Sequence, residues 1–325
     1  MPINDCDAFL LVSFGGPEKR EDVMPFLRNV TRGRNVPDSR LEEVAHHYYL
    51  FDGISPINQL NRSLIAALGQ GFRENGIDLP IYWGNRNWHP LLPDTVRGMG
   101  SDGVRRAVAL ATSGYSSYSS CRQYIEDIDR ACAEVGADAP EIVKLPPFFD
   151  RPCFIEASEH RLADALAALG TAPPWDVHVA FTAHSIPSGM ADNCGYEHQL
   201  RAVADQVAGT LGVKDYSVVF QSRSGPASQQ WLEPDICNHL REVASAGTRE
   251  VVVHPIGFVA DHMEVIYDLD YEAKSLCKEL GVHMVRAATV GTHPLFVQMI
   301  CDMVKDHLQH GQASYCAASC CPSGR

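Results

Sequence analysis

Short apolar runs rich in β-branched residues alternate with longer helical patterns along most of the chain. The expected strands span residues 8–14, 81–85, 106–112, 177–182, 216–221, 251–254 and 283–287. Helical patterns between them cover residues 58–72, 119–135, 153–169, 196–211 and 234–244, and a last one covers 294–310. Because parallel strands need a long crossover, usually a helix, this order predicts an α/β protein with parallel sheets covered by helices.

The alternating runs fall into two sets, separated near the proline-rich segment PPFFDRP at residues 146–152. We therefore expect two similar α/β domains, residues 1–150 and 151–290. The closing helix, within residues 292–310, is expected to join the first domain. The remaining residues, 311–325, form a cysteine-containing tail.

Charge and hydropathy exclude several classes of protein. The formal net charge is -13 at pH 7, which argues against a nucleic-acid partner and favours the approach of cations. Hydrophobic residues make up 45% of the chain, as in ordinary globular proteins, and no apolar run is long enough for a membrane helix. The N-terminal residues lack the basic start and cleavage site of a signal peptide, so we expect a cytoplasmic location without an integral membrane segment.

Polar residues cluster where the expected strands end, at residues 13–15, 84–87, 112–115, 184–185, 222–225 and 257–261. Open α/β sheets bind ligands at this edge. The glycine patterns of dinucleotide and P-loop nucleotide sites are absent, as are the GxSxG and HExxH patterns. Aromatic residues in these loops are compatible with a flat apolar ligand, although most aromatic residues of an α/β protein belong to its core.

The segment VVVHPIGFVADHMEVIYDLDYE, residues 251–272, reads as a strand, a loop and a helix that begins near Asp261. At about 100° per residue, Asp261, Glu264, Asp268 and Glu272 fall within an arc of about 80° on that helix. Like charges at this spacing oppose helix formation. The stripe is either a solvated acidic edge or a path for a divalent metal, since carboxylates and the neighbouring His262 and His254 suit such ions.

Several segments together resemble the ferrochelatases, which insert Fe²⁺ into a porphyrin. They are LLVSFGGPE from Leu10, FDGISPINQL from Phe51, FTAHSIPSGM from Phe181, QSRSGPASQQWLEPD from Gln221 and the acidic segment from Val251. The resemblance spans about residues 8–310 and is closest to the Gram-positive, actinobacterial type. It implies a lyase of haem biosynthesis with two Rossmann-like domains and a porphyrin cleft between them.

The same resemblance implies roles for individual residues. His184 matches the family's catalytic histidine, and Glu264 matches its acidic partner; both are expected to handle protons and metal. Imidazole suits both tasks near neutral pH. Asp268 and Glu272 match a carboxylate path that delivers the metal, so the expected metal-binding set is His184, Glu264, Asp268 and Glu272.

The resemblance also implies porphyrin contacts from Ser55 and Tyr124, with Tyr48 as a further candidate. Arg28, Arg32, Arg34 and Arg40 suit propionate carboxylates, although a solvated loop explains the same cluster. The chain departs from some bacterial relatives at two positions. Phe14 stands where they have a metal-ligating tyrosine, and His47 stands where they have an arginine, so axial ligation by residue 14 is excluded.

The expected substrate is coproporphyrin III, because its four propionates make it more soluble and the chain has no membrane-binding helix. Protoporphyrin IX remains the alternative substrate. A porphyrin or haem carrier, or a chelatase for cobalt or nickel, is the alternative function. A downstream enzyme of haem synthesis is a possible partner for product handover.

Eleven cysteines without an export signal are not expected to form disulfides. Three of them, Cys316, Cys320 and Cys321, lie together in the tail, one thiol short of a four-thiolate centre. The resemblance to cluster-bearing ferrochelatases implies a [2Fe-2S] cofactor with Cys153 as the distant fourth ligand. A structural zinc site and free thiols in the tail are the alternatives.

Overall fold

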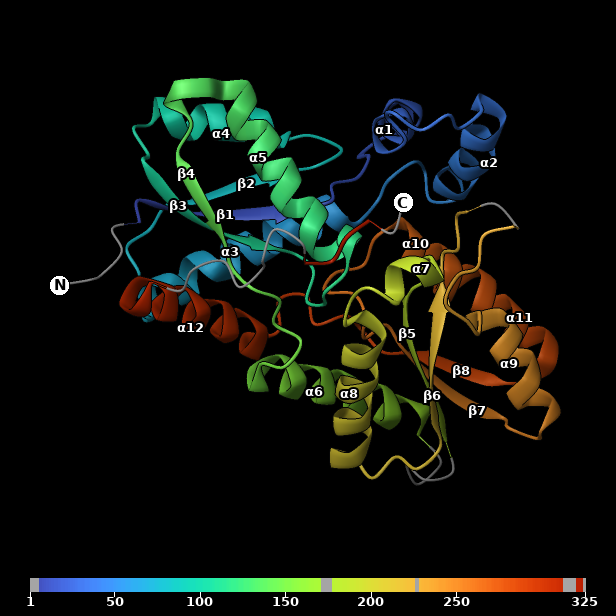
Figure 1. The fold of residues 1–325 in the computed structure, drawn as a ribbon. Helices are drawn as coiled ribbons and strands as arrows, with labels where there is room; N and C mark the ends of the chain where they lie inside the picture. The colour runs from blue at the N-terminus through green and yellow to red at the C-terminus, as the bar shows by residue number, and fades with distance from the viewer. Residues whose placement is uncertain (1–5, 171–176, 226–227, 312–319, 324–325) are drawn as a thin grey trace. The chain divides into compact units, whose positions relative to one another are not determined.

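A computed structural model describes residues 6–170, 177–225, 228–311 and 320–323 of the chain. They form two four-stranded sheets in which every pair of neighbouring strands is parallel, and helices lie between successive strands (Figure 1). The α/β class expected from the alternating pattern is confirmed. None of the helices within this part of the chain is long and apolar enough to cross a lipid bilayer.

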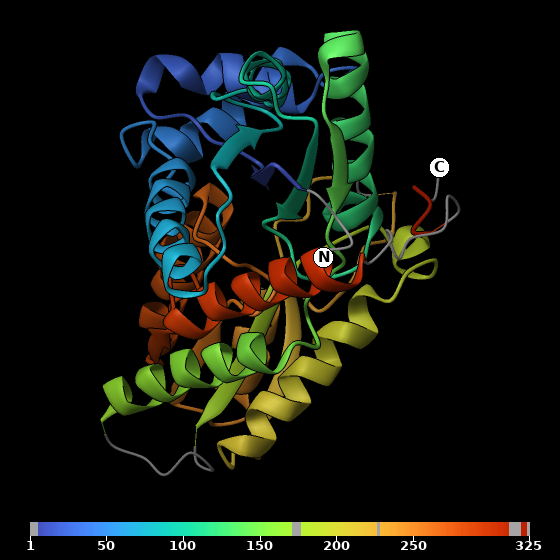
Figure 2. The ribbon, with the colours of Figure 1, turned by 90° about the vertical axis from the view of Figure 1, so that its left-hand side faces the viewer.

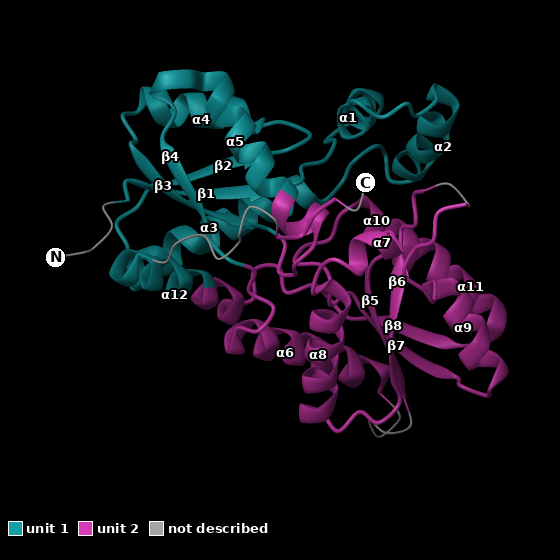
Figure 3. Ribbon diagram, viewed as in Figure 1, with its two compact units in different colours: residues 1–112, 123–146, 300–318 teal, residues 113–122, 147–299, 319–325 magenta. Residues whose placement is uncertain are grey.

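The chain divides into two compact units (Figure 3). Unit 1 takes the described residues of Met1–Thr112, Gln123–Pro146 and Ile300–Ala318, and unit 2 those of Ser113–Arg122, Pro147–Met299 and Ser319–Arg325. The boundary near residue 150 was expected, and the units separate between Pro146 and Pro147. Residues 113–122 belong to unit 2, and the final helix is divided between the units at residue 300.

The sheet of unit 1 has the strand order β2-β1-β3-β4. Its strands are β1 (Ala8–Ser13), β2 (Ile81–Asn85), β3 (Arg106–Ala111) and β4 (Glu141–Lys144). One face packs on α4 (Leu92–Ser101) and α5 (Gln123–Val135) through small and branched apolar side chains. On the other face, Phe9 of β1 meets Phe72 of α3 (Ile57–Glu74) edge to face. Two further helices, α1 (Val23–Val30) and α2 (Asp38–Tyr49), precede α3.

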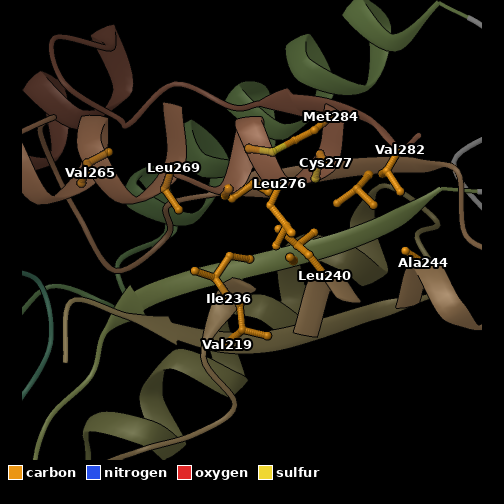
Figure 4. Packing of buried hydrophobic residues seen from close by; sticks show 14 residues of the cluster. Val219, Ile236, Leu240, Ala244, Val265, Leu269, Leu276, Cys277, Val282 and Met284 are labelled. Carbon is orange, nitrogen blue, oxygen red and sulfur yellow. The ribbon is translucent and has the colours of Figure 1, made fainter. Parts of the chain in front are cut away.

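The sheet of unit 2 has the order β6-β5-β7-β8, which repeats the connectivity of the first. Its strands are β5 (His178–His184), β6 (Tyr216–Gln221), β7 (Glu250–His254) and β8 (His283–Arg286). The helices α6 (Pro152–Leu169) and α8 (Tyr196–Thr210) lie side by side (Figure 2). A core that includes Val219, Leu240 and Leu269 packs this sheet against three further elements (Figure 4). They are α9 (Ile236–Ser245), a π-helical segment η5 (Ile266–Ala273) and α11 (Lys274–Leu280).

The expected elements agree with the structure except where sequence signals are weak. Strand β4, helices α1, α2 and α4, and the short helix α7 (Ser188–Ala191) were not predicted. Strand β4 is four residues long, with charged residues at both ends, so it lacks the apolar run of a central strand. The helix expected over 119–135 is a π-helical turn, η2 (Tyr118–Arg122), followed by α5, and α12 (Pro294–His310) matches its prediction.

Candidate active site

The carboxyl edge of the sheet in unit 2 brings together residues that are far apart in the sequence. His184 is the last residue of β5 and lies in register with Gln221, the last residue of β6. The loop after β7 closes onto the same edge, since the Gly257 N–H donates to the carbonyl of Thr182 over 3.0 Å. Parallel strands all end at this edge, so the loops that follow them meet there.

His184 and Glu264 form a hydrogen-bonded ion pair at this edge. The Nε2 atom of His184 lies 3.5 Å from Oε2 of Glu264, and its Nδ1 lies 2.5 Å from the carbonyl oxygen of Ser185. Burial alone would lower the pKa of His184, but the carboxylate of Glu264 and the Ser185 carbonyl raise this pKa to about 9. Burial alone would raise the pKa of the Glu264 carboxyl, but the positively charged imidazolium of His184 lowers this pKa to about 2. Without metal, the pair is therefore ionised at neutral pH.

A second imidazole, that of His262, faces the same carboxylate. Its Nδ1 lies 4.0 Å from Oε2 of Glu264, and its ring packs edge to face on Phe258 with centroids 5.0 Å apart. Burial lowers the pKa of His262, and the charge of His184 adds to this effect. The described residues contain no group of three or more His, Cys, Asp or Glu side chains arranged to hold a metal ion.

Asp268 lies next to this pair and is held by two donors from the end of β6. The Ser222 hydroxyl donates to Oδ2 of Asp268 over 2.5 Å, and Gln221 Nε2 donates to the same oxygen over 3.2 Å. Gln221 also donates to the carbonyl of Glu264 over 3.1 Å. Burial is the largest influence on Asp268 and raises its pKa to about 7; the charges of Glu264 and Glu272 act in the same direction. Glu264, Asp268 and the exposed Glu272 therefore interact as one column of acids.

Asp261 does not belong to this column, and the expected four-residue stripe is wrong in that respect. Its carboxylate pairs with the guanidinium of Arg286, with Oδ2 and Nη2 separated by 2.8 Å. The helix also begins later than expected, at Met263 of the short α10 (Met263–Val265), and continues as the π-helical segment η5. The arc calculated for an α-helix does not apply to a π-helix, which closes its hydrogen bonds over five residues.

The carboxyl edge of the sheet in unit 1 carries aromatic side chains instead. Phe14, directly after β1, contacts Phe26 with ring centroids 6.2 Å apart, and Phe26 contacts Tyr48 at 5.8 Å. The guanidinium of Arg86, after β2, lies 4.5 Å from the ring centre of Tyr124 and pairs with Asp127. Only 7% of the Arg86 side chain is exposed. A cation–π contact in such surroundings orients the aromatic ring.

Ser55 supports the loop after β1. Its backbone N–H donates to the carbonyl of Pro17 over 2.9 Å, and its side chain is buried against Gly16. Sequence patterns did not single out Arg86, although its position falls in the polar cluster after the second expected strand. Tyr115, in contrast, is a core residue: it is fully buried, and its hydroxyl donates to the Ile256 carbonyl.

The arginine-rich segment around α1 and α2 is exposed and mostly engaged in local contacts. Arg28 pairs with Asp38 at 3.5 Å, Arg32 donates to Asn29, and Arg40 pairs with Glu43 at 2.6 Å. Exposed pairs of this kind contribute little to stability. These arginines can exchange a local partner for an incoming carboxylate at small cost.

Comparison with known proteins gives a consistent assignment. The family model described as "Ferrochelatase" matches residues 6–308. A ferrochelatase from Rhodopirellula baltica is 55% identical over 303 residues, covering 93% of this chain and 86% of the relative. The chain belongs to the ferrochelatase family. A coproporphyrin III ferrochelatase from Mycolicibacterium smegmatis is 50% identical, covering 94% of this chain and 90% of that protein.

Two solved structures share the fold of this ferrochelatase-family chain. SirB from Bacillus subtilis, solved with Fe³⁺, superposes with a TM-score of 0.59 at 14% identity and covers 96% of this chain and all of its own. DR2241 from Deinococcus radiodurans superposes with a TM-score of 0.56 at 13% identity, over 97% of this chain and 56% of its own. At such low identity the agreement concerns the fold alone.

Two of the expected cluster cysteines are adjacent in the structure. The sulfur atoms of Cys320 and Cys321 lie 3.6 Å apart, and Cys321 is buried. Burial raises the pKa of the Cys321 thiol, and Cys320, Cys121 and Cys194 raise it further. Cys153, the distant ligand implied by the family resemblance, lies at the start of α6. Cys316 lies outside the described residues.

Proposed function

We propose that this member of the ferrochelatase family inserts Fe²⁺ into coproporphyrin III. The observation that carries the proposal is the His184–Glu264 pair at the sheet edge, in a chain about half identical to proteins named coproporphyrin III ferrochelatase. Insertion replaces two pyrrole N–H protons by one Fe²⁺ ion and transfers no electrons. The chain must therefore supply proton acceptors and oxygen or nitrogen ligands for the metal.

His184 is the proposed acceptor of the pyrrole protons. Because its pKa is about 9 in the absence of metal, its Nε2 first has to lose a proton. An approaching Fe²⁺ ion lowers the pKa of a nearby imidazole by charge repulsion, which frees the nitrogen when the metal arrives. Glu264 then balances the metal charge, and Asp268, with a pKa of about 7, accepts or releases protons at neutral pH. Glu272, exposed at the end of the column, is the proposed entry point for the metal.

The aromatic edge of unit 1 is the proposed porphyrin-binding surface, with Tyr124, Tyr48 and Ser55 as contacts. A porphyrin ring offers a large flat apolar face, and aromatic side chains provide matching surface. Phe14 cannot coordinate the metal, so axial ligation by residue 14 is excluded. The exposed arginines Arg28, Arg32, Arg34 and Arg40 are proposed to receive propionates, of which coproporphyrin III has four.

The substrate is tested by anaerobic insertion assays with Fe²⁺ and either coproporphyrin III or protoporphyrin IX. We expect a higher kcat/KM for coproporphyrin III in detergent-free buffer. A higher kcat/KM for protoporphyrin IX would reverse the assignment. Tight binding of both porphyrins without any metalation would identify a carrier.

We also propose a [2Fe-2S] cluster held by tail cysteines. Two thiolates on one tetrahedral metal ion with metal–sulfur bonds of about 2.3 Å have their sulfurs about 3.8 Å apart. The 3.6 Å between Cys320 and Cys321 fits this spacing. Cys316 is the third proposed ligand. The family resemblance implies Cys153 as the fourth. Cys121 and Cys194 are further candidates, because both influence the pKa of Cys321. When bound, such a cluster would fasten the tail to unit 2.

Purification without oxygen tests the cluster. We expect a reddish protein whose visible absorption is bleached by dithionite and is lost in the Cys320→Ser variant. Separate Cys153→Ser, Cys121→Ser and Cys194→Ser variants identify the fourth ligand by the same loss of absorption. A colourless protein that contains zinc, or no metal, would rule out the cluster.

A further inference from the structure

The π-helical segment η5 is an unusual support for a column of acids. It is eight residues long, whereas π-helices occur mostly as single turns inside α-helices. The segment and the residues just before it carry Asp261, Glu264, Asp268, Asp270 and Glu272. Like charges repel along a helix at the i,i+4 spacing of this column. Something outside the segment must therefore oppose that repulsion and hold its winding.

Arg286, the last residue of β8, contacts Asp270 within the segment and Asp261 ahead of it. Its Nη2 and Nη1 atoms donate to Oδ2 and Oδ1 of Asp261 over 2.8 and 3.2 Å, and its Nε donates to Oδ1 of Asp270 over 2.7 Å. The exposed fractions of the three side chains are 16%, 21% and 34% for Arg286, Asp261 and Asp270. Bidentate charged hydrogen bonds with this little solvent access are stronger than surface ion pairs.

We propose that Arg286 is a positioning residue for metal insertion, and that it acts by clamping the chain at Asp261, ahead of α10, and at Asp270, within the π-helical segment. The clamp sorts the acids into two sets. Asp261 and Asp270 are neutralised by the guanidinium. Glu264, Asp268 and Glu272 form no ion pair with an arginine or lysine among the described residues and stay available to a cation.

The position of the two contacts explains why one arginine suffices. Asp261 lies just before α10, and Asp270 lies in the middle of η5, so Glu264 and Asp268 fall between the two anchored points. Asp261 and Asp270 both bond to Arg286, which lies on β8, a strand that is paired along its length with β7. A displacement of about 1 Å in a reacting group can cost about 100-fold in rate. Lysine could not replace the arginine fully, since it lacks the planar fork that reaches both carboxylates.

The test compares Arg286→Gln, Arg286→Lys and Asp270→Asn in the full-length protein, with Arg249→Gln as control. Arg249 lies at the opposite, amino end of this sheet, just before β7, and within the described residues its side chain donates to the carbonyls of Ala244 and Thr248. We expect Arg286→Gln to lower kcat/KM for Fe²⁺ by about tenfold to 100-fold, with the Kd for porphyrin changed by less than about threefold. Arg286→Lys and Asp270→Asn should lie between this variant and wild type, and Arg249→Gln should match wild type.

Hydrogen exchange of the backbone amides gives a readout that a general loss of stability would not produce. In Arg286→Gln, exchange should accelerate in residues 263–273 and remain unchanged in α9. Unchanged iron kinetics and unchanged exchange in Arg286→Gln would overturn the proposal. Equal changes in the iron and porphyrin parameters, or faster exchange throughout unit 2, would also overturn it, since they indicate a purely structural role.

The inference rests on the proposed metal path, and a parallel Asp268→Asn variant separates the two. If Asp268→Asn impairs iron insertion and Arg286→Gln does not, the clamp is wrong and the path stands. If Glu264→Gln and Asp268→Asn both turn over at the wild-type rate, the path itself fails, and the clamp has no metal path to position.

Discussion

The two sheets share one strand connectivity, yet their carboxyl edges carry opposite chemistry. In unit 1 the edge is aromatic, with Phe14, Tyr124 and the buried guanidinium of Arg86. In unit 2 the edge is titratable, with His184 and Glu264. The same topology thus carries packed aromatic side chains at one edge and titratable side chains at the other. The fold supplies an edge where loops meet, and the loop residues decide what that edge binds.

The largest effect is expected from the titratable edge. His184→Ala and Glu264→Gln should each lower kcat/KM for Fe²⁺ insertion by at least about 100-fold, the usual range for losing a general acid–base group. Porphyrin binding should stay within about tenfold, because these side chains are assigned to protons and metal. Anaerobic insertion rates and porphyrin fluorescence quenching measure the two quantities. Asp268→Asn and Glu272→Gln should cost less, since a path has alternatives.

A matched histidine–carboxylate pair at the opposite edge of the same sheet is the control. The Nδ1 of His283 lies 3.2 Å from Oε2 of Glu250, and these residues begin strands β8 and β7. His283→Ala should leave insertion unchanged. Wild-type turnover in His184→Ala or Glu264→Gln, or a comparable loss in His283→Ala, would contradict the assignment of the titratable edge.

The tight loops at the two edges should differ in how much substitution they tolerate. A Cβ added at Gly257 would lie 2.7 Å from the Cα of Ala183 and 2.5 Å from its Cβ, so the backbone has to move. At Gly16 the nearest atoms are side-chain atoms of Ser55 and Ile57, at 2.7–2.9 Å. We expect Gly257→Ala to lower the free energy of unfolding by about 1–3 kcal/mol, and Gly16→Ala by less. Denaturant unfolding measures both, and the reverse order would contradict this comparison.

The aromatic edge should affect porphyrin binding and leave iron binding unchanged. Phe14→Ala removes a half-buried ring that contacts Phe26 and Arg86, so KM for porphyrin should rise about tenfold. The KM for Fe²⁺ should remain at the wild-type value. Steady-state kinetics with each substrate varied in turn distinguish the two parameters, and an increase confined to the iron KM would be inconsistent with a porphyrin-binding edge in unit 1.

The smallest effect concerns the pH dependence of stability. The pKa of His184 is raised from 6.5 to about 9, so its stabilising effect is complete below pH 6.5 and is lost as pH rises through 9. The pKa of Glu264 is lowered from 4.5 to about 2, so its effect is complete above pH 4.5 and is lost as pH falls through 2. Solvent reaches 32% of the His184 side chain and 48% of that of Glu264, which keeps the effect modest.

Thermal unfolding of wild type and Glu264→Gln across pH measures this contribution. The difference in Tm should be largest between pH 4.5 and 6.5 and should shrink toward pH 9. A difference that does not vary over this range would show that the two groups do not interact as an ion pair.

Much of the fold was predictable from local pattern. The strands of both sheets, except β4, follow from β-branched apolar runs that end in polar residues, and their parallel pairing follows from the helices between them. The family resemblance singles out His184, Glu264 and Asp268, and their roles stay a prediction, although the structure brings His184 and Glu264 within 3.5 Å. Strand β4 was not, because its pairing to β3 rather than its sequence makes it a strand.

The tertiary structure alone decided which acids are paired and which are available. Sequence spacing placed Asp261 with Glu264, Asp268 and Glu272, but Arg286 reaches Asp261 from a strand that lies 25 residues away in the chain. It likewise decided that Ser222 and Gln221 donate to Asp268 and that Arg86 lies over Tyr124. Periodicity describes one element at a time, whereas the charge state of a carboxylate depends on the groups that other elements bring within a few ångströms.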